Sequence, residues 1–351
     1  MSFMEEDELE KNAGMADDLS SCMAVSMAAL RKEKKFPAVH NCRSALRSFA
    51  LFWEGKKAGE VRMPMHEVFT PECLKEYETW LFENQYSPNT VSTYMRALQT
   101  VYRRWMPPGT EGYNPVLFKN VYTRVEARTK RALTAAQMEK LMGTDTGMLP
   151  PEQQQTLACF LLMFMLRGMP FIDLCHLRKG DLRDGRITYR RHKTGVLMMV
   201  DVPPEALRLI QKYRNRTDSE YLFPLLDDGQ EDGLHSSEMQ DAEELSRRYQ
   251  CVLRRFNREL AGLMKRLLPG VKVSSYTARH TWATIAYHIG VSVGLISQSM
   301  GHSSIQVTMT YLKPFDAEVI DKVNRQVISF VRKCKKKKDG RYNRLYGIAL
   351  R

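Results

Sequence analysis

The feature that most constrains the fold is a helical spacing of apolar residues between Ser87 and Trp105, followed by a complete break. The stripe consists of Val91, Tyr94, Met95, Leu98, Tyr102 and Trp105. Ser87-Pro88 predicts the start of this helix, and Thr70-Pro71-Glu72 predicts the start of the helix before it, each with a hydroxyl as N-cap. Intervals of three and four residues keep such side chains on one face of an α-helix. Pro107-Pro108-Gly109 ends the pattern, and the next helical start is a capping sequence at Thr134. The chain therefore contains at least two helical parts joined by a connecting segment.

Length and charge narrow the class of protein. The chain has 351 residues and a formal net charge of +13, and domains usually hold about 100 to 200 residues. Residues 1–18 carry a net charge of −6 and residues 332–351 carry +8, which leaves +11 on residues 19–331. Because the surplus is spread over the body of the chain, it indicates a polyanionic partner or an anionic surface.

These patterns divide the chain into five segments. We expect an acidic arm, a helical domain, a basic linker, a second domain and a basic tail. The corresponding residues are 1–18, 19–106, 107–131, 132–331 and 332–351.

The second domain combines helices with a small sheet. Residues 151–166, which end in a ten-residue apolar run, predict a buried helix, and two strands are predicted at Arg186–Arg190 and Val196–Val202. The loop between them contains His192-Lys193-Thr194-Gly195, which is a hairpin signal. Residues 227–244 form an acidic insert. Helices are predicted after it at about Glu238–Leu267, Thr281–Ile289, Ser292–Ser299, Ser304–Thr310 and Asp316–Val331. The expected fold class is mainly α, with a small antiparallel sheet in an α+β second domain.

Several classes of protein are disfavoured. The longest apolar run has ten residues, about half of what a membrane-spanning helix needs, and the N-terminus has no secretory signal pattern. The seven cysteines are scattered, and no His, Cys or Asp set has metal-ligand spacing. We therefore expect a cytoplasmic protein with no metal, no other cofactor and no membrane partner.

The densest group of reactive side chains lies near the C-terminus. Arg279, His302 and Tyr311 are separated by two short helices and a turn, so that they can fold back onto one site. Ser303 and Gln306 predict a capping box that holds His302 at a helix entrance. A free phenol has a pKa of about 10. Nearby cations favour the phenolate, and they also stabilise charge on an attacked phosphate.

These residues resemble the tyrosine recombinase (phage integrase) family. The matching elements are Arg279-His-Thr-Trp-Ala-Thr, then Gly301-His302-Ser-Ser, then Tyr311 nine residues after His302. Ser87-Pro88-Asn-Thr-Val-Ser-Thr-Tyr94 is similar to part of the helical core-binding domain of that family, and the likeness extends from about residue 20 to 330. It implies a SAM-like core-binding domain, a catalytic domain, and DNA strand exchange through a 3′-phosphotyrosyl intermediate without ATP or metal.

The resemblance also assigns roles to single residues. Tyr311 is expected to be the nucleophile, and Arg279 to clamp the non-bridging phosphate oxygens with the help of His302. Lys193, in the predicted hairpin, matches the lysine that protonates the departing 5′ oxygen. Each role has a physical reason, because a protein nucleophile, fixed donors and a general acid each lower the barrier.

Two positions depart from the family pattern. Tyr276 stands where the first histidine of H-x-x-R is expected, and its hydroxyl can donate a hydrogen bond but is a poor proton shuttle near pH 7. Pro170 stands where the commoner pattern has the first arginine, three residues before Asp173. A branch of the family with Arg-Gly-Met here makes Arg167 the candidate, and Asp173 would then orient one of the arginines.

The expected partner is double-stranded DNA. The proposed phosphate contacts are Arg96, Arg103, Arg104, Lys130 and Arg131. The resemblance implies a homo-tetramer in the synapse, with a monomer or dimer off DNA, and it leaves room for accessory DNA-bending proteins. The apolar residues of a last helix at 316–331 are candidates for docking on a neighbouring protomer. Such a protein would associate with the nucleoid in a bacterial cytoplasm.

Other interpretations remain open at this stage. The basic residues on the predicted helix and linker could be a solvated surface. The chain could also be a DNA-binding regulator of the same fold that does not cut, a type IB topoisomerase-like nicking and closing enzyme, or a basic helical scaffold. The sequence does not specify the target site, nor whether the outcome is integration, excision or inversion.

Overall fold

A computed structural model describes residues 17–56, 62–124, 132–227 and 238–336. The chain divides into two compact units. The first unit comprises residues 1–128 and 232–247, and the second comprises residues 129–231 and 248–351. Most of the acidic arm, Lys130, Arg131, residues 228–237 of the acidic insert and residues 337–351 of the basic tail lie outside the described residues.

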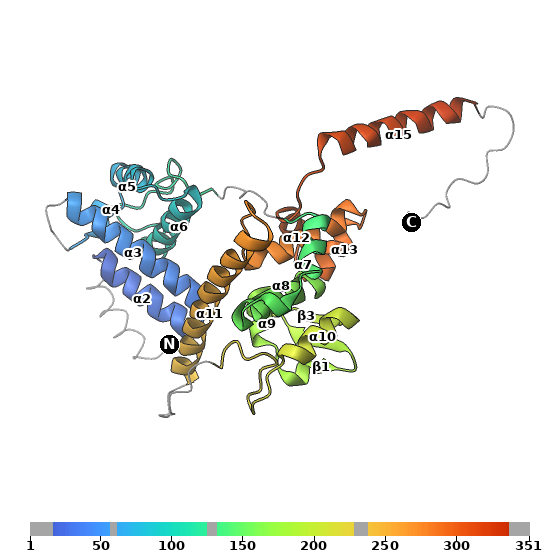
Figure 1. Cartoon of the computed structure of the whole chain (residues 1–351). Helices are drawn as coiled ribbons and strands as arrows, with labels where there is room; N and C mark the ends of the chain where they lie inside the picture. Colours follow the sequence, from blue (N-terminus) through green and yellow to red (C-terminus); the bar gives the residue numbers. More distant parts are fainter. Residues whose placement is uncertain (1–16, 57–61, 125–131, 228–237, 337–351) are drawn as a thin grey trace. The chain divides into compact units, whose positions relative to one another are not determined.

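The first unit is helical. Its helices are α2 (Leu19–Lys32), α3 (Phe36–Lys56), α4 (Met65–Val68), α5 (Pro71–Glu83) and α6 (Pro88–Trp105) (Figure 1). Two of the helix starts follow directly from the sequence. The hydroxyl of Thr70 accepts the backbone N–H of Cys73, and the hydroxyl of Ser87 accepts that of Thr90. Each cap satisfies one N–H that the helix itself leaves unpaired, and both predicted starts are confirmed.

An aromatic cluster forms the core of the first unit. The rings of Phe49 and Tyr77 meet edge to face with their centroids 4.8 Å apart. The predicted stripe of α6 faces this core, although Tyr94 and Trp105 at its margins are only half-buried. Residues 117–121 of the segment expected to be a linker also pack into the core, and Glu78 accepts the N–H of Tyr122 at 2.6 Å. The connection therefore folds onto the first unit up to this point.

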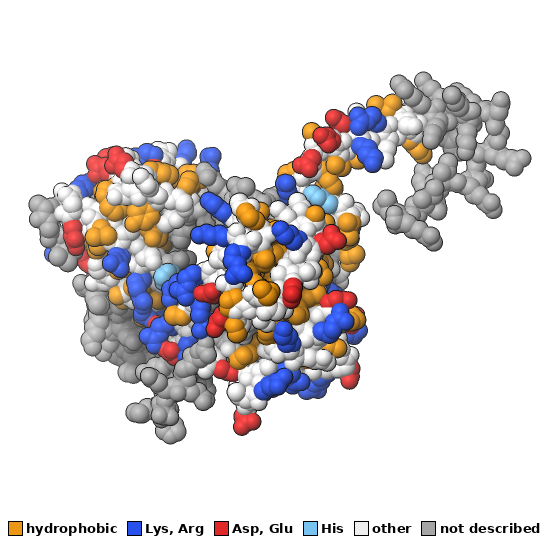
Figure 2. All heavy atoms as spheres, in the orientation of Figure 1, with side chains coloured by type: hydrophobic (Ala, Val, Ile, Leu, Met, Phe, Trp, Pro, Cys, Tyr) orange, Lys and Arg blue, Asp and Glu red, His pale blue; other side chains and the backbone are white. Residues whose placement is uncertain are grey.

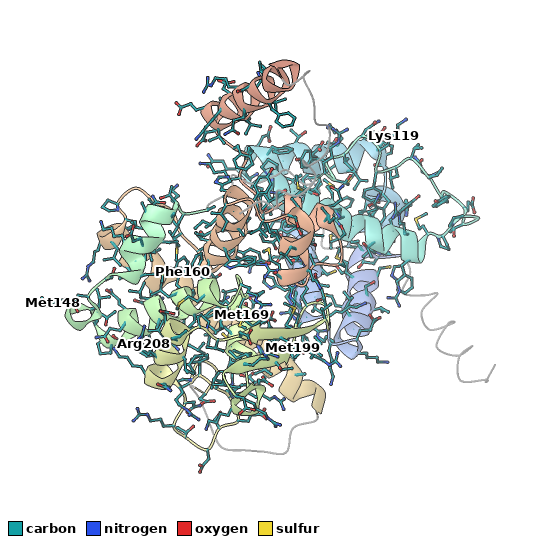
Figure 3. The ribbon with its side chains drawn as sticks, turned by 90° about the vertical axis from the view of Figure 1, so that its right-hand side faces the viewer. Lys119, Met148, Phe160, Met169, Met199 and Arg208 are labelled. Atoms are coloured by element: carbon teal, nitrogen blue, oxygen red, sulfur yellow. The ribbon has the colours of Figure 1, made fainter. Side chains whose placement is uncertain are left out.

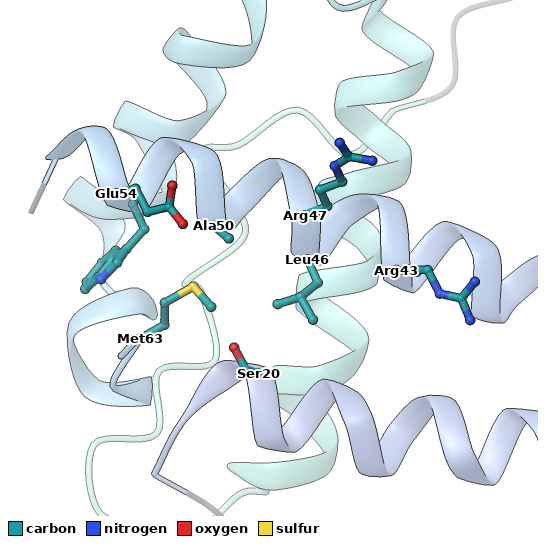
Figure 4. A pocket seen from close by; sticks show the side chains of 8 residues that line it. Ser20, Arg43, Leu46, Arg47, Ala50, Glu54 and Met63 are labelled. Carbon is teal, nitrogen blue, oxygen red and sulfur yellow. The ribbon is translucent and has the colours of Figure 1, made fainter. Parts of the chain in front are cut away.

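A pocket of about 230 Å³ lies beside α2 and α3 (Figure 4). Its lining combines apolar side chains with two arginines and one carboxylate: Ser20, Arg43, Leu46, Arg47, Ala50, Trp53, Glu54 and Met63. None of the residues proposed for chemistry lines it.

The second unit surrounds the long apolar helix α8 (Pro151–Met165), whose Phe160 is fully buried (Figure 3). Before the sheet come α7 (Ala135–Met142), η1 (Thr146–Met148), α9 (Phe171–His176) and η2 (Lys179–Asp181). After it come α10 (Pro204–Tyr213), α11 (Glu238–Leu267), α12 (Ser275–His288), α13 (Val293–Ser299), α14 (Ile305–Met309) and α15 (Ala317–Lys336). Residues 238–247 of α11 group with the first unit.

The sheet has three antiparallel strands in the order β1-β2-β3: β1 (Leu182–Arg183), β2 (Arg186–Arg190) and β3 (Leu197–Asp201). The paired residues Ile187 and Val200 point into the core, as do Tyr189 and Met198. This alternation is typical of a sheet with one buried face. The predicted fold class and hairpin are confirmed, and the two-residue β1 is an addition.

The predicted start of α12 and the predicted capping residue of α14 were wrong, and local capping explains both. Helix α12 begins at Ser275 rather than near Thr281, because the N–H of Ser274 donates to the hydroxyl of Thr277 in a capping arrangement. Helix α14 is capped by Ser304 rather than Ser303, since the Ser304 hydroxyl accepts the N–H of Gln306 at 3.2 Å. The earlier start of α12 puts Tyr276 and Arg279 on one continuous helix.

In the described part of the chain, no helix combines the length and the apolar character that crossing a membrane requires.

Candidate active site

Arg279 lies at the centre of the site with only 3% of its surface exposed. Its Nη1 donates to the carbonyl of Gly168 at 2.7 Å, and its Nη2 donates to the carbonyl of Met300 at 2.7 Å. Nη2 also donates to Nε2 of His302 at 2.8 Å. Two backbone carbonyls therefore fix the guanidinium. One belongs to the turn after α8, and the other lies at the C-terminal end of α13.

Gly168 allows the turn after α8 to approach helix α12. Its φ is +66°, and a Cβ at this position would lie 3.0 Å from Cα of Arg279 and 3.2 Å from its Cγ. Any other residue would combine a strained left-handed backbone with a steric clash. The glycine is thus a requirement for the hydrogen bond that positions Arg279.

His302 is held from both ring nitrogens. Nε2 binds Arg279, and Nδ1 lies 2.9 Å from the hydroxyl oxygen of Thr308. Burial, together with the positive charges of Arg279, Arg191 and Lys193, lowers the pKa of His302 to about 4. The imidazole is therefore neutral at physiological pH.

Tyr311 follows directly after α14 and is half-buried. Nδ1 of His280 and the hydroxyl of Thr284 both donate to its backbone carbonyl, at 3.2 and 3.3 Å. Its ring stacks on that of His302 with centroids 5.1 Å apart, and the guanidinium carbon of Arg279 lies 5.4 Å from the ring centroid. The tyrosine, the histidine and the arginine singled out from the sequence therefore lie together.

Tyr276 joins this group from the first turn of α12. Its ring is nearly parallel to that of Tyr311, at a centroid distance of 6.3 Å. Although 51% of its surface is exposed, partial burial raises the pKa of Tyr276 to about 12, and the neighbouring Tyr311, with which it shares a hydrogen bond, adds to the increase. Tyr276 therefore stays protonated at neutral pH and acts as a hydrogen-bond donor.

A second buried arginine, Arg191, belongs to the site and was not among the sequence candidates. It is 7% exposed, and its Nη1 donates to the carbonyl of Gly301 at 2.6 Å. Its Nε lies 3.7 Å from Oδ2 of Asp173, whose Oδ1 accepts the N–H of His192. The sequence contained a signal for it, because Ile187 and Tyr189 point inward and the alternation along the strand continues to residue 191.

Asp173 is 3% exposed, and burial raises the pKa of its carboxyl group, against the opposing effects of the His192 N–H and the Arg191 charge. It was expected to orient one of the arginines of the site. The arginine that it contacts is Arg191.

Comparison with protein families adds to this geometry. Residues 131–318 match the phage integrase family, and residues 18–107 match the phage integrase SAM-like domain. The chain belongs to the phage integrase family.

Similar proteins agree with this membership. Tyrosine recombinase XerA of Pyrococcus furiosus is 24% identical over 286 residues, which are 76% of this chain and 88% of that protein. The solved Tn1549 transposon integrase in complex with transposon right end DNA has a TM-score of 0.57 at 15% identity, covering 89% of this chain and 99% of that one. A lambda integrase tetramer bound to a Holliday junction has a TM-score of 0.55 at 15% identity, covering 87% and 82%. These structures share the fold, and the protein is a tyrosine recombinase.

Two further residues that were expected to take part in catalysis, Lys193 and Arg167, lie near the hairpin. Lys193 is exposed in the turn between β2 and β3, and it is close enough to His302 to contribute to the lowered pKa of that residue. Arg167 has a φ of +60° and donates from Nη1 to the carbonyl of Met199 on β3, at 3.2 Å. Its hydrogen bond thus joins the turn after α8 to the sheet, whereas Arg191 lies beside Arg279 and His302.

The candidate DNA contacts of the tyrosine recombinase lie on the first unit and in the connection. Arg96, Arg103 and Arg104 are exposed on α6, off the buried stripe. Lys130 and Arg131 lie outside the described residues. Lys and Arg side chains are visible on both units in Figure 2, so the positive charge is not confined to one part of the chain.

Proposed function

We propose that this recombinase cuts and rejoins DNA strands through a covalent 3′-phosphotyrosyl intermediate on Tyr311. The observation that carries the proposal is the meeting of the Tyr311 ring with the guanidinium of Arg279 and the imidazole of His302. A phenol, a fixed cation and a neutral imidazole are the groups that phosphoryl transfer to a protein nucleophile needs.

The reaction consists of two opposite displacements. The Tyr311 oxygen attacks phosphorus, the bond from phosphorus to the 5′ oxygen breaks, and Lys193 donates a proton to that oxygen. A 5′ hydroxyl from another strand then attacks the phosphotyrosyl bond and releases the tyrosine. Since each bond broken is replaced by one of similar energy, the exchange needs neither ATP nor a metal.

Arg279 is well suited to clamp the phosphate. Its guanidinium is fixed by carbonyls before any substrate arrives, and its buried Nε has no hydrogen-bond partner among the described residues. A non-bridging phosphate oxygen would satisfy this donor, and the positive charge of Arg191 adds to the local potential. In this proposal Tyr276 donates a hydrogen bond, and Arg167 assists from the turn after α8.

Double-stranded DNA is the proposed substrate, and a homo-tetramer the active assembly, formed from monomers or dimers. The solved relatives bound to DNA, including a lambda integrase tetramer, support both. The apolar side chains of α15 that were expected to dock on a neighbour are all 42–59% exposed: Val319, Ile320, Val323, Val327, Ile328 and Phe330. In this proposal the protein works in a bacterial cytoplasm and associates with the nucleoid when it binds DNA. Accessory DNA-bending proteins are further candidate partners.

Trapping the intermediate tests the proposal. A nicked suicide duplex is first selected for binding from a pool with random half-sites, and is then incubated with the wild type, Tyr311→Phe and the matched control Tyr287→Phe. We expect a covalent adduct, resistant to detergent, with the wild type and the control but not with Tyr311→Phe, and equal duplex binding by all three. The phenol oxygen is the only group that these substitutions remove.

Other outcomes identify other functions. If all three proteins bind the duplex and none forms an adduct, the chain is a regulator that does not cut. An adduct accompanied by plasmid relaxation, but by no site-specific joint product, would instead identify a nicking and closing enzyme.

A further inference from the structure

The contacts of His302 determine which of its ring nitrogens carries the proton. An arginine side chain has only donors, so Nε2 of His302 must accept the hydrogen bond from Nη2 of Arg279. A neutral imidazole then carries its single proton on Nδ1. That proton is donated to the hydroxyl oxygen of Thr308, 2.9 Å away.

Thr308 connects the histidine to the nucleophile. Its side chain is fully buried in α14, and its backbone carbonyl accepts the N–H of Tyr311 at 2.9 Å. One residue therefore binds the ring of His302 through its hydroxyl and the backbone of Tyr311 through its carbonyl. The first contact fixes the orientation of the imidazole, and the second fixes where the tyrosine leaves the helix.

The proposed reaction requires an acceptor for the phenol proton of Tyr311. Tyr276 holds its own proton because its pKa is raised to about 12, and Arg279 can only donate. Nδ1 of His280 is directed to the backbone carbonyl of Tyr311. Two imidazole lone pairs then remain near the Tyr311 ring, Nε2 of His280 and Nε2 of His302, with ring centroids 4.8 and 5.1 Å away. Of these two nitrogens, Nε2 of His302 is the one that also contacts Arg279, the proposed phosphate clamp.

We propose that Thr308 is a positioning residue that keeps the proton of His302 on Nδ1, so that Nε2 accepts the proton of the Tyr311 hydroxyl during attack. This inference rests on the proposed function. The phenol oxygen bonds to phosphorus, its O–H bond breaks, and the proton moves to Nε2. The resulting imidazolium keeps its Nδ1–H on Thr308.

Bound DNA makes Nε2 of His302 a better proton acceptor. In the free protein Nη2 of Arg279 occupies this lone pair. A phosphate with one oxygen bound at Nε of Arg279 offers a second non-bridging oxygen to Nη2 as a stronger, anionic acceptor, so that Nη2 can leave Nε2 of His302. The charged groups that act on His302 are Arg279 from α12 and Arg191 and Lys193 from the hairpin, all positive. A phosphate between them opposes their effect and raises the proton affinity of the imidazole.

Three threonine variants test the positioning role. Thr308→Val keeps the shape but removes the hydroxyl, Thr308→Ser keeps the hydroxyl, and Thr310→Val is the matched control on an exposed residue two positions away. Adduct formation on the selected nicked duplex is timed from pH 6 to 9. We expect Thr308→Val to be slower by about 10- to 100-fold near pH 7, a part of what general base catalysis contributes. Hydroxide replaces the missing base at high pH, so the deficit should shrink towards pH 9, while Thr308→Ser and Thr310→Val stay close to the wild type.

A spectroscopic measurement on the full-length protein without DNA tests the tautomer directly. The ring nitrogens of ¹⁵N-labelled histidines are observed by NMR, and His302→Gln identifies the signals of His302. We expect a protonated Nδ1 and a bare Nε2 in the wild type, and loss of this preference in Thr308→Val.

The outcomes separate this inference from the function on which it rests. A wild type with the proton on Nε2, or Thr308→Val and Thr308→Ser that are equally slow at every pH, would overturn the positioning role alone. A Thr308→Val protein with the wild-type pH profile would do the same. Failure of the wild type to form any adduct would overturn the proposed function, and this inference with it.

Discussion

Two glycines position the two buried arginines of the active site. The carbonyl of Gly168 accepts from Arg279 and that of Gly301 accepts from Arg191, and both glycines have a positive φ. A Cβ on Gly301 would lie 2.8 Å from Cδ of Arg191, just as a Cβ on Gly168 would meet Arg279. Close approach of the backbone therefore places both cations, and Arg191 also has the carboxylate of Asp173 beside it, 3.7 Å from its Nε.

We predict that Gly168→Ala destabilises the protein more than Gly185→Ala. Both residues have a positive φ, +66° and +72°, but a Cβ on Gly185 would meet nothing within 4 Å. The left-handed backbone costs roughly 1–2 kcal/mol in either variant, and overpacking against Arg279 adds about 1–3 kcal/mol for Gly168→Ala. The free energy of unfolding in urea measures the difference, and equal losses would show that the turn moves away from α12 without cost.

Helix α14 connects the two halves of the catalytic group, because His302 precedes it and Tyr311 follows it. A helix of five residues has few internal hydrogen bonds and depends on its ends. Ser304 caps the start, Thr308 contacts both His302 and Tyr311, and the carbonyl of Tyr311 accepts a hydrogen bond from His280 of α12. The spacing of nine residues between His302 and Tyr311 thus corresponds to the short helix α14 together with the residues that connect it to each of them.

The cap gives a prediction at the level of this element. Ser304→Ala should lower the free energy of unfolding by about 1 kcal/mol, since an N–H at the helix start loses its acceptor. Ser303→Ala is the matched control, because the hydroxyl of Ser303 is not the capping group and its side chain is exposed. Urea unfolding of both variants measures the effect, and a larger loss for Ser303→Ala would mean that the helix starts one residue earlier in solution.

At the scale of the whole molecule, the net charge of +13 is distributed over both units and the connection between them. DNA binding of this kind releases counterions, so its strength falls with salt in proportion to the number of phosphates neutralised. The proposed contacts on α6 and in the connection would supply part of that neutralisation, whereas Arg279 and Arg191 are buried in the second unit.

We predict that changing Lys130 and Arg131 together to alanine flattens the salt dependence of duplex binding by about two in log–log slope, roughly one for each phosphate that is no longer neutralised. The control replaces Arg186 and Arg208, which lie beside Asp201 and Glu205 and have carboxylates as partners already. Fluorescence anisotropy at several salt concentrations gives both slopes. If the two double variants behave alike, Lys130 and Arg131 are an ordinary solvated surface.

Local signals in the sequence predicted much of the fold. The caps at Thr70 and Ser87 and the hairpin strands were recognisable because neighbouring residues decide them through short-range hydrogen bonds and periodicity. The start of α12 and the capping residue of α14 were misjudged because Ser and Thr residues stand close together there, and only the backbone geometry selects the one that caps.

By itself, the sequence determined the family of this protein and the grouping of Arg279, His302 and Tyr311. The spacing of these motifs along the chain can be recognised without knowing how the side chains pack. Only the tertiary structure decided that Arg191 is the second buried cation, that Asp173 contacts it, and that Thr308 holds the ring of His302. These contacts join residues through a hairpin, a tight turn and a capped helix. They depend on distances between elements of the fold, and spacing along a sequence does not contain those distances.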